Sequence, residues 1–115
     1  MLRKMLLAKI HRATVTQADL NYIGSITIDR ALMDAAQLYE NEYVEIYNIN
    51  NGSRFGTYVI PGEENSGVIC LNGAAARLVQ TGDKIIIVNY GYLSQSELEA
   101  HEPIILQMDE YNRIQ

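Results

Sequence analysis

Two strand-like segments joined by an Asn-Gly pair constrain the fold of this chain more than any other feature. Residues 54–60 form the second of these segments, and residues 43–49 form the first, which alternates between aliphatic and polar or aromatic side chains. This period of two residues is typical of a strand with one buried face. Asn-Gly is the preferred pair in tight hairpin turns. We therefore predict a β-hairpin that turns at Asn51-Gly52, with its second strand ended by Pro61-Gly62.

The rest of the chain predicts more strands and only short helices. Strand patterns cover residues 3–16, 25–28, 68–71, 84–90 and 103–108, and residues 16–21 are polar and turn-like. Helical spacing follows Asp29 as far as Asn41, a short helix follows Asn72 as its cap, and a third is capped by Ser94 or Ser96. About six or seven strands with helices confined to connections favour a mainly β chain, folded as a small closed barrel with mixed strand pairing.

Length and composition restrict the classes of protein. A chain of 115 residues forms one domain. Its net charge of −5 and the lack of a basic run argue against nucleic-acid binding. The longest apolar run, residues 85–88, is too short to span a membrane, and the first nine residues hold no secretory signal. The single cysteine, Cys70, excludes an intrachain disulfide and is interpreted as a small buried hydrophobe. We expect a cytoplasmic protein.

The sequence lacks the residue patterns that several common kinds of functional site require. His11 and His101 have no cysteine or carboxylate at metal-ligand spacing, so no zinc site is predicted. The glycines form no phosphate-binding motif. Ser25 lacks both the Gly-x-Ser-x-Gly turn and a nearby base, which argues against a serine hydrolase.

The remaining candidate is the pair Gly24-Ser25, which precedes a short strand. Glycine allows backbone geometries closed to other residues, and the Ser25 hydroxyl lies beside the Gly24 carbonyl carbon, close enough to attack it if the peptide is bent. Other polar groups lie at strand ends and helix starts, and each has an ordinary structural explanation as a solvated face, surface charge, strand residue or cap. They are Lys9, Tyr22, Arg54, Thr57, Tyr58, Asn72 and the amides of Gly73, Ala74 and Ala75.

Five short sequence motifs, in this order and at this spacing, are the basis of a resemblance to a known family. They are residues 9–13 before Val15-Thr16, residues 22–25, residues 50–55, Thr57-Tyr58 and residues 71–76. Over nearly its whole length the chain resembles the pyruvoyl-dependent aspartate 1-decarboxylases. The resemblance implies a double-psi β-barrel, a homotetramer with active sites at subunit boundaries, and the conversion of L-aspartate to β-alanine and CO2 for pantothenate and coenzyme A biosynthesis.

The resemblance also implies a cofactor cut from the chain itself. Decarboxylation of an amino acid leaves a carbanion, which needs an electron sink. In the family, Ser25 attacks the Gly24 carbonyl, and the resulting ester eliminates to give residues 1–24 and residues 25–115 with a pyruvoyl group at position 25. This group forms a Schiff base with the substrate, so neither a metal nor pyridoxal phosphate is expected.

Roles for the other residues follow from the same resemblance. Thr57 is expected to stabilise the oxyanion on Gly24 during cleavage, and Arg54 to bind a substrate carboxylate. Tyr58 is expected to return a proton to the substrate carbon. Asn72 with Gly73, Ala74 and Ala75 would bind an anion or carbonyl, Lys9 would add positive charge, and Tyr22 would shape the pocket.

Two other hypotheses remain open. In the first, the chain is a barrel that has lost self-cleavage and serves as a ligand-binding or interaction module. In the second, it is a hydrolase that uses Ser25. The intact set of Gly24, Ser25, Arg54, Thr57 and Tyr58 argues against the first, and the missing base against the second.

Overall fold

The predicted hairpin is present at the centre of the sheet. A computed structural model describes residues 1–115. β4 (Tyr43–Asn48) pairs antiparallel with β5 (Arg54–Gly62) across the Asn51-Gly52 turn. The remaining elements are β1 (Arg3–Thr14), β2 (Gln17–Asp19), β3 (Ser25–Asp29), α1 (Arg30–Ala36), β6 (Ile69–Asn72), the 3-10 helix η1 (Gly73–Leu78), β7 (Lys84–Leu93), α2 (Gln95–Leu98) and β8 (Ile104–Gln107).

The sheet curls into a ring because β1 continues into β2. The strand order is β2-β6-β3-β5-β4-β7-β1-β8. Only Val15 and Thr16 separate β1 from β2, and the Thr16 N–H donates to the Ile69 carbonyl at 2.8 Å. One extended segment therefore pairs with β7 at its start and with β6 at its end. Counting β1 and β2 as one strand turns the eight strands into seven, within the predicted six or seven, and β8 lies outside the ring.

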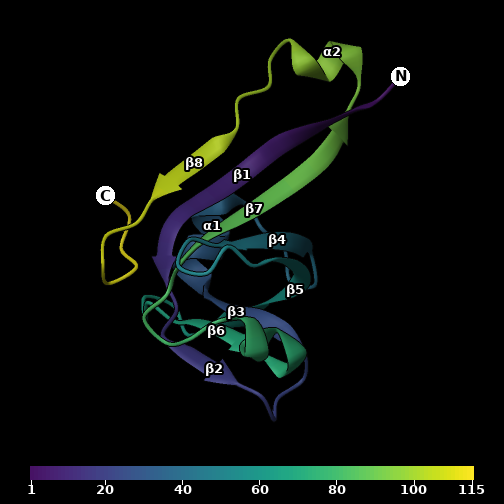
Figure 1. Ribbon diagram of the computed structural model, residues 1–115. Helices are drawn as coiled ribbons and strands as arrows, with labels where there is room; N and C mark the ends of the chain where they lie inside the picture. Colours follow the sequence, from purple (N-terminus) through teal and green to yellow (C-terminus); the bar gives the residue numbers. More distant parts are fainter.

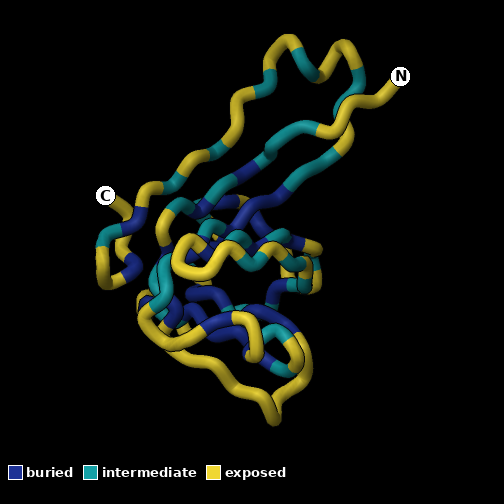
Figure 2. The backbone as a smooth tube through the Cα atoms, viewed as in Figure 1, coloured by how far each residue is buried: buried dark blue, intermediate teal, exposed yellow.

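The interior of the ring is filled by aliphatic side chains from alternate strand positions. These core side chains are fully or almost fully buried; they include Ile10, Val15, Ile26, Ile28, Val44, Ile46, Val59, Ile69, Leu71, Ile85 and Ile87. Leu32, Met33 and Ala36 of α1 add to the same core. Figure 2 shows this burial concentrated in the barrel, whereas the projecting strands are mostly intermediate and the loop before β3 is exposed.

All three helices begin where the sequence predicts, and α1 ends early. The side chain of Asp29 accepts from the Ala31 N–H at 2.8 Å and so caps α1. α1 ends at Ala36 rather than near Asn41, because Gln37 adopts a left-handed conformation (φ 57°). Ser94, not Ser96, caps α2, and its backbone and side-chain hydrogen bonds with Glu97 lower the pKa of that carboxyl.

Several strand bounds differ from the prediction; β1 ends at Thr14 instead of residue 16, and β7 continues to Leu93 instead of residue 90. The polar segment 17–19 forms β2, since its backbone pairs in parallel with residues 70–72 of β6. β5 runs through Pro61 to Gly62, which pair with Ile28 and Asp29 of β3. β2 and β5 obtain their partners from distant parts of the chain, which local turn signals do not reveal.

An arm projects from the barrel. The start of β1, the end of β7, α2 and β8 extend together away from the ring, with the N-terminus near the tip (Figure 1). The molecule measures 43 × 27 × 24 Å. None of its helices has the length and apolar character needed to cross a membrane.

Candidate active site

Ser25 lies at the point where the chain passes from solvent into the barrel. It is the first residue of β3 and is fully buried, whereas Gly24 before it is exposed. The Ser25 hydroxyl donates to the Ile23 carbonyl at 3.0 Å and accepts from Nδ2 of Asn72 at 2.9 Å. The hydroxyl is therefore held by two partners, directly beside the carbonyl of an exposed peptide.

Asn72 has a different role from the helix cap that we predicted. It precedes η1, but its side chain forms no capping hydrogen bond. Its Nδ2 donates to the hydroxyls of Ser25 and Thr27, the latter at 3.0 Å, and its Oδ1 accepts from the Cys70 thiol at 3.1 Å. Residues 69–72 pair with residues 25–28, so the amide faces β3 instead of the helix.

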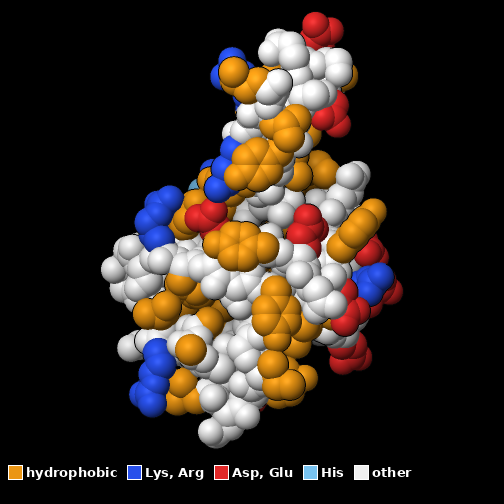
Figure 3. Space-filling view, turned by 90° about the vertical axis from the view of Figure 1, so that its right-hand side faces the viewer, with side chains coloured by type: hydrophobic (Ala, Val, Ile, Leu, Met, Phe, Trp, Pro, Cys, Tyr) orange, Lys and Arg blue, Asp and Glu red, His pale blue; other side chains and the backbone are white.

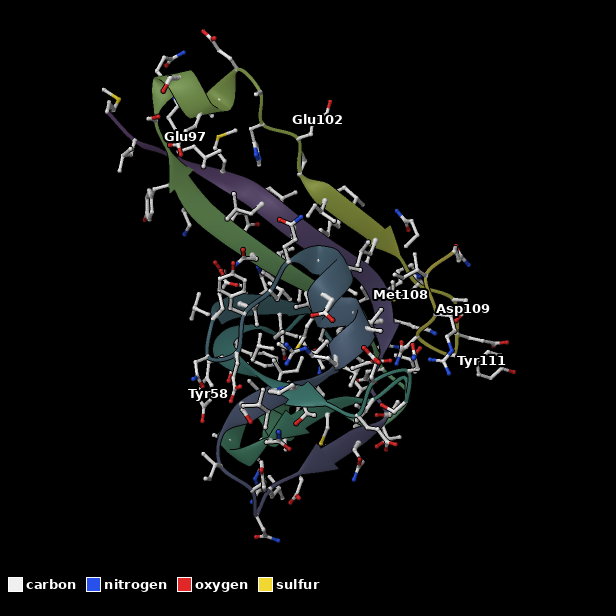
Figure 4. The ribbon with its side chains drawn as sticks, turned by 180° about the vertical axis from the view of Figure 1, so that it is seen from behind. Tyr58, Glu97, Glu102, Met108, Asp109 and Tyr111 are labelled. Atoms are coloured by element: carbon white, nitrogen blue, oxygen red, sulfur yellow. The ribbon has the colours of Figure 1, made fainter.

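A cavity of about 430 Å³ opens beside Gly24. It brings together six of the predicted residues, contributed by the loop before β3, by β5, and by β6 with η1. Apolar neighbours that the sequence did not single out complete its wall. The lining residues are Gly24, Phe55, Gly56, Thr57, Tyr58, Asn72, Ala74, Ala75 and Leu78. Figure 4 shows Tyr58 at the outer edge of the barrel, away from the arm. Thr57 shares the cavity with Gly24 without a hydrogen bond between them.

Gly73 packs directly against the backbone at Gly24. Its φ of 66° lies in the left-handed region. A Cβ added there would lie 2.7 Å from the Gly24 Cα and 3.2 Å from the Tyr22 carbonyl oxygen. No side chain fits at this position without moving the Gly24-Ser25 segment, so Gly73 fixes where that segment lies.

Lys9 and Arg54 lie away from this cavity, on the outer face of the sheet. The Arg54 guanidinium stacks on the Tyr47 ring, 3.7 Å from its centroid. The Tyr47 hydroxyl is 3.1 Å from the Tyr90 hydroxyl, with which it forms a hydrogen bond. Burial, as the larger cause, and this hydrogen bond raise the pKa of Tyr47 to about 12. Lys9 pairs with Val88 of β7, which pairs with Glu45 of β4 on its other side. The two cations therefore occupy a separate surface.

This outer face, formed by β5, β4, β7 and β1, is rich in tyrosine. Tyr43 and Tyr92 are 61% and 66% exposed, and a side chain on Gly56 would collide with the ring of Tyr43. Figure 3 shows hydrophobic ring side chains spread over one face of the barrel, with Lys or Arg and Asp or Glu between them. Exposed aromatic surface of this kind is typical of a contact surface.

Tyr22 lies in the exposed loop before the cleavage candidate. Its side chain borders a hollow of about 220 Å³ on the far side of Asn72 from the main cavity, together with Thr27 and Cys70. Cys70 is buried, as the sequence predicts, but its thiol makes a hydrogen bond that a hydrophobe cannot make. No group of three or more His, Cys, Asp or Glu side chains gathers where it would hold a metal ion.

Comparisons with known proteins identify sequences similar to this chain. A family model described as aspartate decarboxylase matches residues 1–115. Proteins named aspartate 1-decarboxylase from Heliobacterium modesticaldum and Neisseria meningitidis are 62% and 61% identical, over 93% and 99% of this chain and 81% and 90% of their own lengths. One from Caldicellulosiruptor bescii is 63% identical over 96% of this chain and 87% of its own.

Among solved structures, the computationally designed protein msDPBB_sym2 matches with a TM-score of 0.51 and 20% identity. The match covers 74% of this chain and 96% of the designed protein. At this identity the likeness concerns the fold alone, and it confirms the predicted double-psi β-barrel.

Proposed function

The chain belongs to the aspartate decarboxylase family, and from this premise we propose that it converts L-aspartate to β-alanine and CO2 with a pyruvoyl group made from Ser25. In this proposal residues 1–115 form one self-processing domain. The enzyme acts in the cytoplasm and supplies β-alanine for pantothenate and coenzyme A biosynthesis, as the family resemblance implies.

The observation that carries the proposal is the environment of the Ser25 hydroxyl. The hydroxyl is buried, it is held by Asn72, and its residue follows an exposed glycine that lines the cavity. A serine beside a peptide carbonyl can attack it, provided that the backbone is free to distort, and Gly24 provides that freedom. These features fit a group generated in place at position 25 and opening into the cavity.

The proposed maturation uses only this chain and water. Ser25 Oγ bonds to the Gly24 carbonyl carbon while the peptide C–N bond breaks, and the hydroxyl proton passes to the freed nitrogen. Loss of the Ser25 Cα proton then breaks the Cβ–Oγ bond, and Gly24 leaves as a carboxylate. The dehydroalanine left at position 25 tautomerises to an imine, which water hydrolyses to the pyruvoyl group and ammonia. Thr57, which shares the cavity with Gly24, would stabilise the oxyanion of the first step.

In substrate turnover the pyruvoyl ketone would form a Schiff base with the amino group of aspartate and accept the electron pair released with CO2. Tyr58 lines the cavity and would return the proton to the substrate carbon. Asn72 and the backbone of Gly73, Ala74 and Ala75 would hold a substrate carbonyl or carboxylate. Tyr22 would shape the opposite side near the cut end.

Arg54 and Lys9 require a second copy of the chain. Both are proposed to bind or attract the acidic substrate, yet neither lines the cavity beside Gly24. Placing the tyrosine-rich face of one copy against the cavity of another would supply both cations to it. We therefore propose a homotetramer in which each active site lies at a subunit boundary.

Intact mass spectrometry and a denaturing gel test the proposal. We expect two fragments, residues 1–24 ending in a free Gly24 carboxylate and residues 25–115 with a blocked amino end, and release of CO2 from L-aspartate. A chain that stays whole after prolonged warm incubation, alone or with a cell extract to supply any maturation factor, would favour the second function, a barrel that only binds ligands or partners.

Replacing Arg54 with lysine should weaken substrate binding more than self-cleavage. Lysine keeps the charge but loses the bidentate contact with a carboxylate, a loss of roughly 1.5 kcal/mol or more, so KM for aspartate should rise about tenfold or more. The cleavage rate should stay within about twofold. Steady-state kinetics and the gel assay measure the two effects, with Arg30→Lys on the exposed face of α1 as the matched control. An equal loss in both assays would make Arg54 a structural residue.

A further inference from the structure

We propose that Cys70 and Thr27 are positioning residues that turn the side-chain amide of Asn72 so that its NH2 group, and not its oxygen, faces Ser25. This inference rests on the proposed self-cleavage, for which it identifies two further residues. Neither residue lines the cavity beside Gly24.

The four side chains form a square on two paired strands. Ser25 pairs with Asn72, and Thr27 pairs with Cys70, in the antiparallel register of β3 and β6. Because side chains on a strand alternate between faces, residues two apart lie on the same face. Asn72 donates to Ser25 at 2.9 Å and to Thr27 at 3.0 Å, and the Cys70 thiol donates to the Asn72 oxygen at 3.1 Å. Asn72 is 2% exposed and Cys70 is 6% exposed, so water has little access to the carboxamide and the thiol.

The thiol selects between the two orientations of the amide. The hydroxyls of Ser25 and Thr27 each donate or accept, so they tolerate either end of the carboxamide. A protonated thiol is a donor and only a weak acceptor, which favours the carboxamide oxygen on its side. Burial, as the larger cause, and the negative charge of Asp19 raise the pKa of Cys70, so the thiol keeps its proton at neutral pH.

The orientation matters most when the ester formed by Ser25 eliminates. In that step the Cβ–Oγ bond breaks, and the electron pair moves to Oγ as the Gly24 carboxylate leaves. A donor aimed at Oγ stabilises this developing charge. With the amide turned over, the carboxamide oxygen would face Oγ and repel it. Cys70 and Thr27 therefore act through Asn72 on the leaving oxygen.

Three variants test the inference by the rate of self-cleavage in freshly purified, uncut chain. Cys70→Ala removes the donor and should slow cleavage about fivefold to tenfold, the effect of one hydrogen bond. Thr27→Val removes the second hydroxyl and should slow it by a similar factor. Cys70→Ser keeps a donor and should cleave within about twofold of the original chain. Serine and alanine are similar in size, so a purely structural role for Cys70 predicts equal losses in both.

A second readout follows the amide directly. In the uncleavable background Ser25→Gly, the nuclear Overhauser effects of the Asn72 side-chain NH2 protons should connect them to Thr27 in the parent and in Cys70→Ser. They should weaken or shift towards residue 70 in Cys70→Ala. Equal cleavage by Cys70→Ala and the original chain, or an unchanged pattern in Cys70→Ala, would overturn the inference and leave the proposed function standing. An original chain that never cleaves overturns the proposed function, and the amide pattern then decides alone whether Cys70 orients Asn72.

Discussion

Replacing Ser25 with alanine is expected to give a chain that stays full length and releases no CO2 from aspartate. In the proposed mechanism this substitution removes the oxygen that attacks Gly24 and later leaves with it, so neither cleavage nor a pyruvoyl group would follow. Alanine is smaller than serine and fits the buried position at the start of β3, so the barrel should still fold. A gel, an intact mass and a CO2-release assay measure the result.

The matched control is Ser96→Ala, which removes an exposed hydroxyl on α2. This variant should cleave and decarboxylate like the original chain. Decarboxylation by Ser25→Ala would disprove the pyruvoyl mechanism, and its cleavage at Gly24 would disprove the attack by Ser25.

Replacing Gly73 with alanine should block maturation through the backbone. The new Cβ would lie 2.7 Å from the Gly24 Cα and 2.8 Å from the Gly24 nitrogen, and alanine also resists the φ of 66°. Strain of this kind costs about 1–3 kcal/mol and displaces the segment that must bend during cleavage. We expect a lower midpoint in thermal unfolding and cleavage slowed at least about a hundredfold, since small displacements of reacting groups have effects of this size.

Gly82→Ala separates the two causes. Gly82 has a φ of 96° but no neighbouring atom within 4 Å of an added Cβ. It should lose stability through backbone strain while keeping its cleavage rate. If Gly73→Ala loses only as much stability as Gly82→Ala and still cleaves normally, contact with Gly24 has no part in maturation.

Local pattern was sufficient to predict most of the fold. The period-two alternation of residues 43–48 and the Asn51-Gly52 turn predicted β4 and β5, and Asp29 was identified as the cap of α1. β2 was missed because its three polar residues gain strand geometry only from β6. The length of β5 was underestimated because Pro61 pairs with β3, a partner far away in the sequence.

The candidate site was predictable only where its residues belong to recognisable motifs. The short motifs shared with the family identified Gly24, Thr57, Tyr58 and Asn72, and the structure places these residues around one cavity. Thr27 and Cys70 were missed because their contacts with Asn72 depend on strand register, and Thr27 lies 45 positions from Asn72. The spacing of two between Ser25 and Thr27, and between Cys70 and Asn72, was the available signal, but it has meaning only once β3 and β6 are known to pair.

The continuous β1–β2 segment determines what a cut after Gly24 would leave behind. Residues 1–24 hold both strands, which form hydrogen bonds with β6, β7 and β8 and contribute Ile10, Ala13 and Val15 to the core. The short fragment is thus a wall of the barrel and cannot leave without opening it. Once cut, however, an unfolded molecule becomes two separate chains that must meet again, so refolding becomes bimolecular and slows on dilution. The lifetime of the mature protein would therefore depend on its slow unfolding rate, and activity lost by heating in dilute solution would return only slowly.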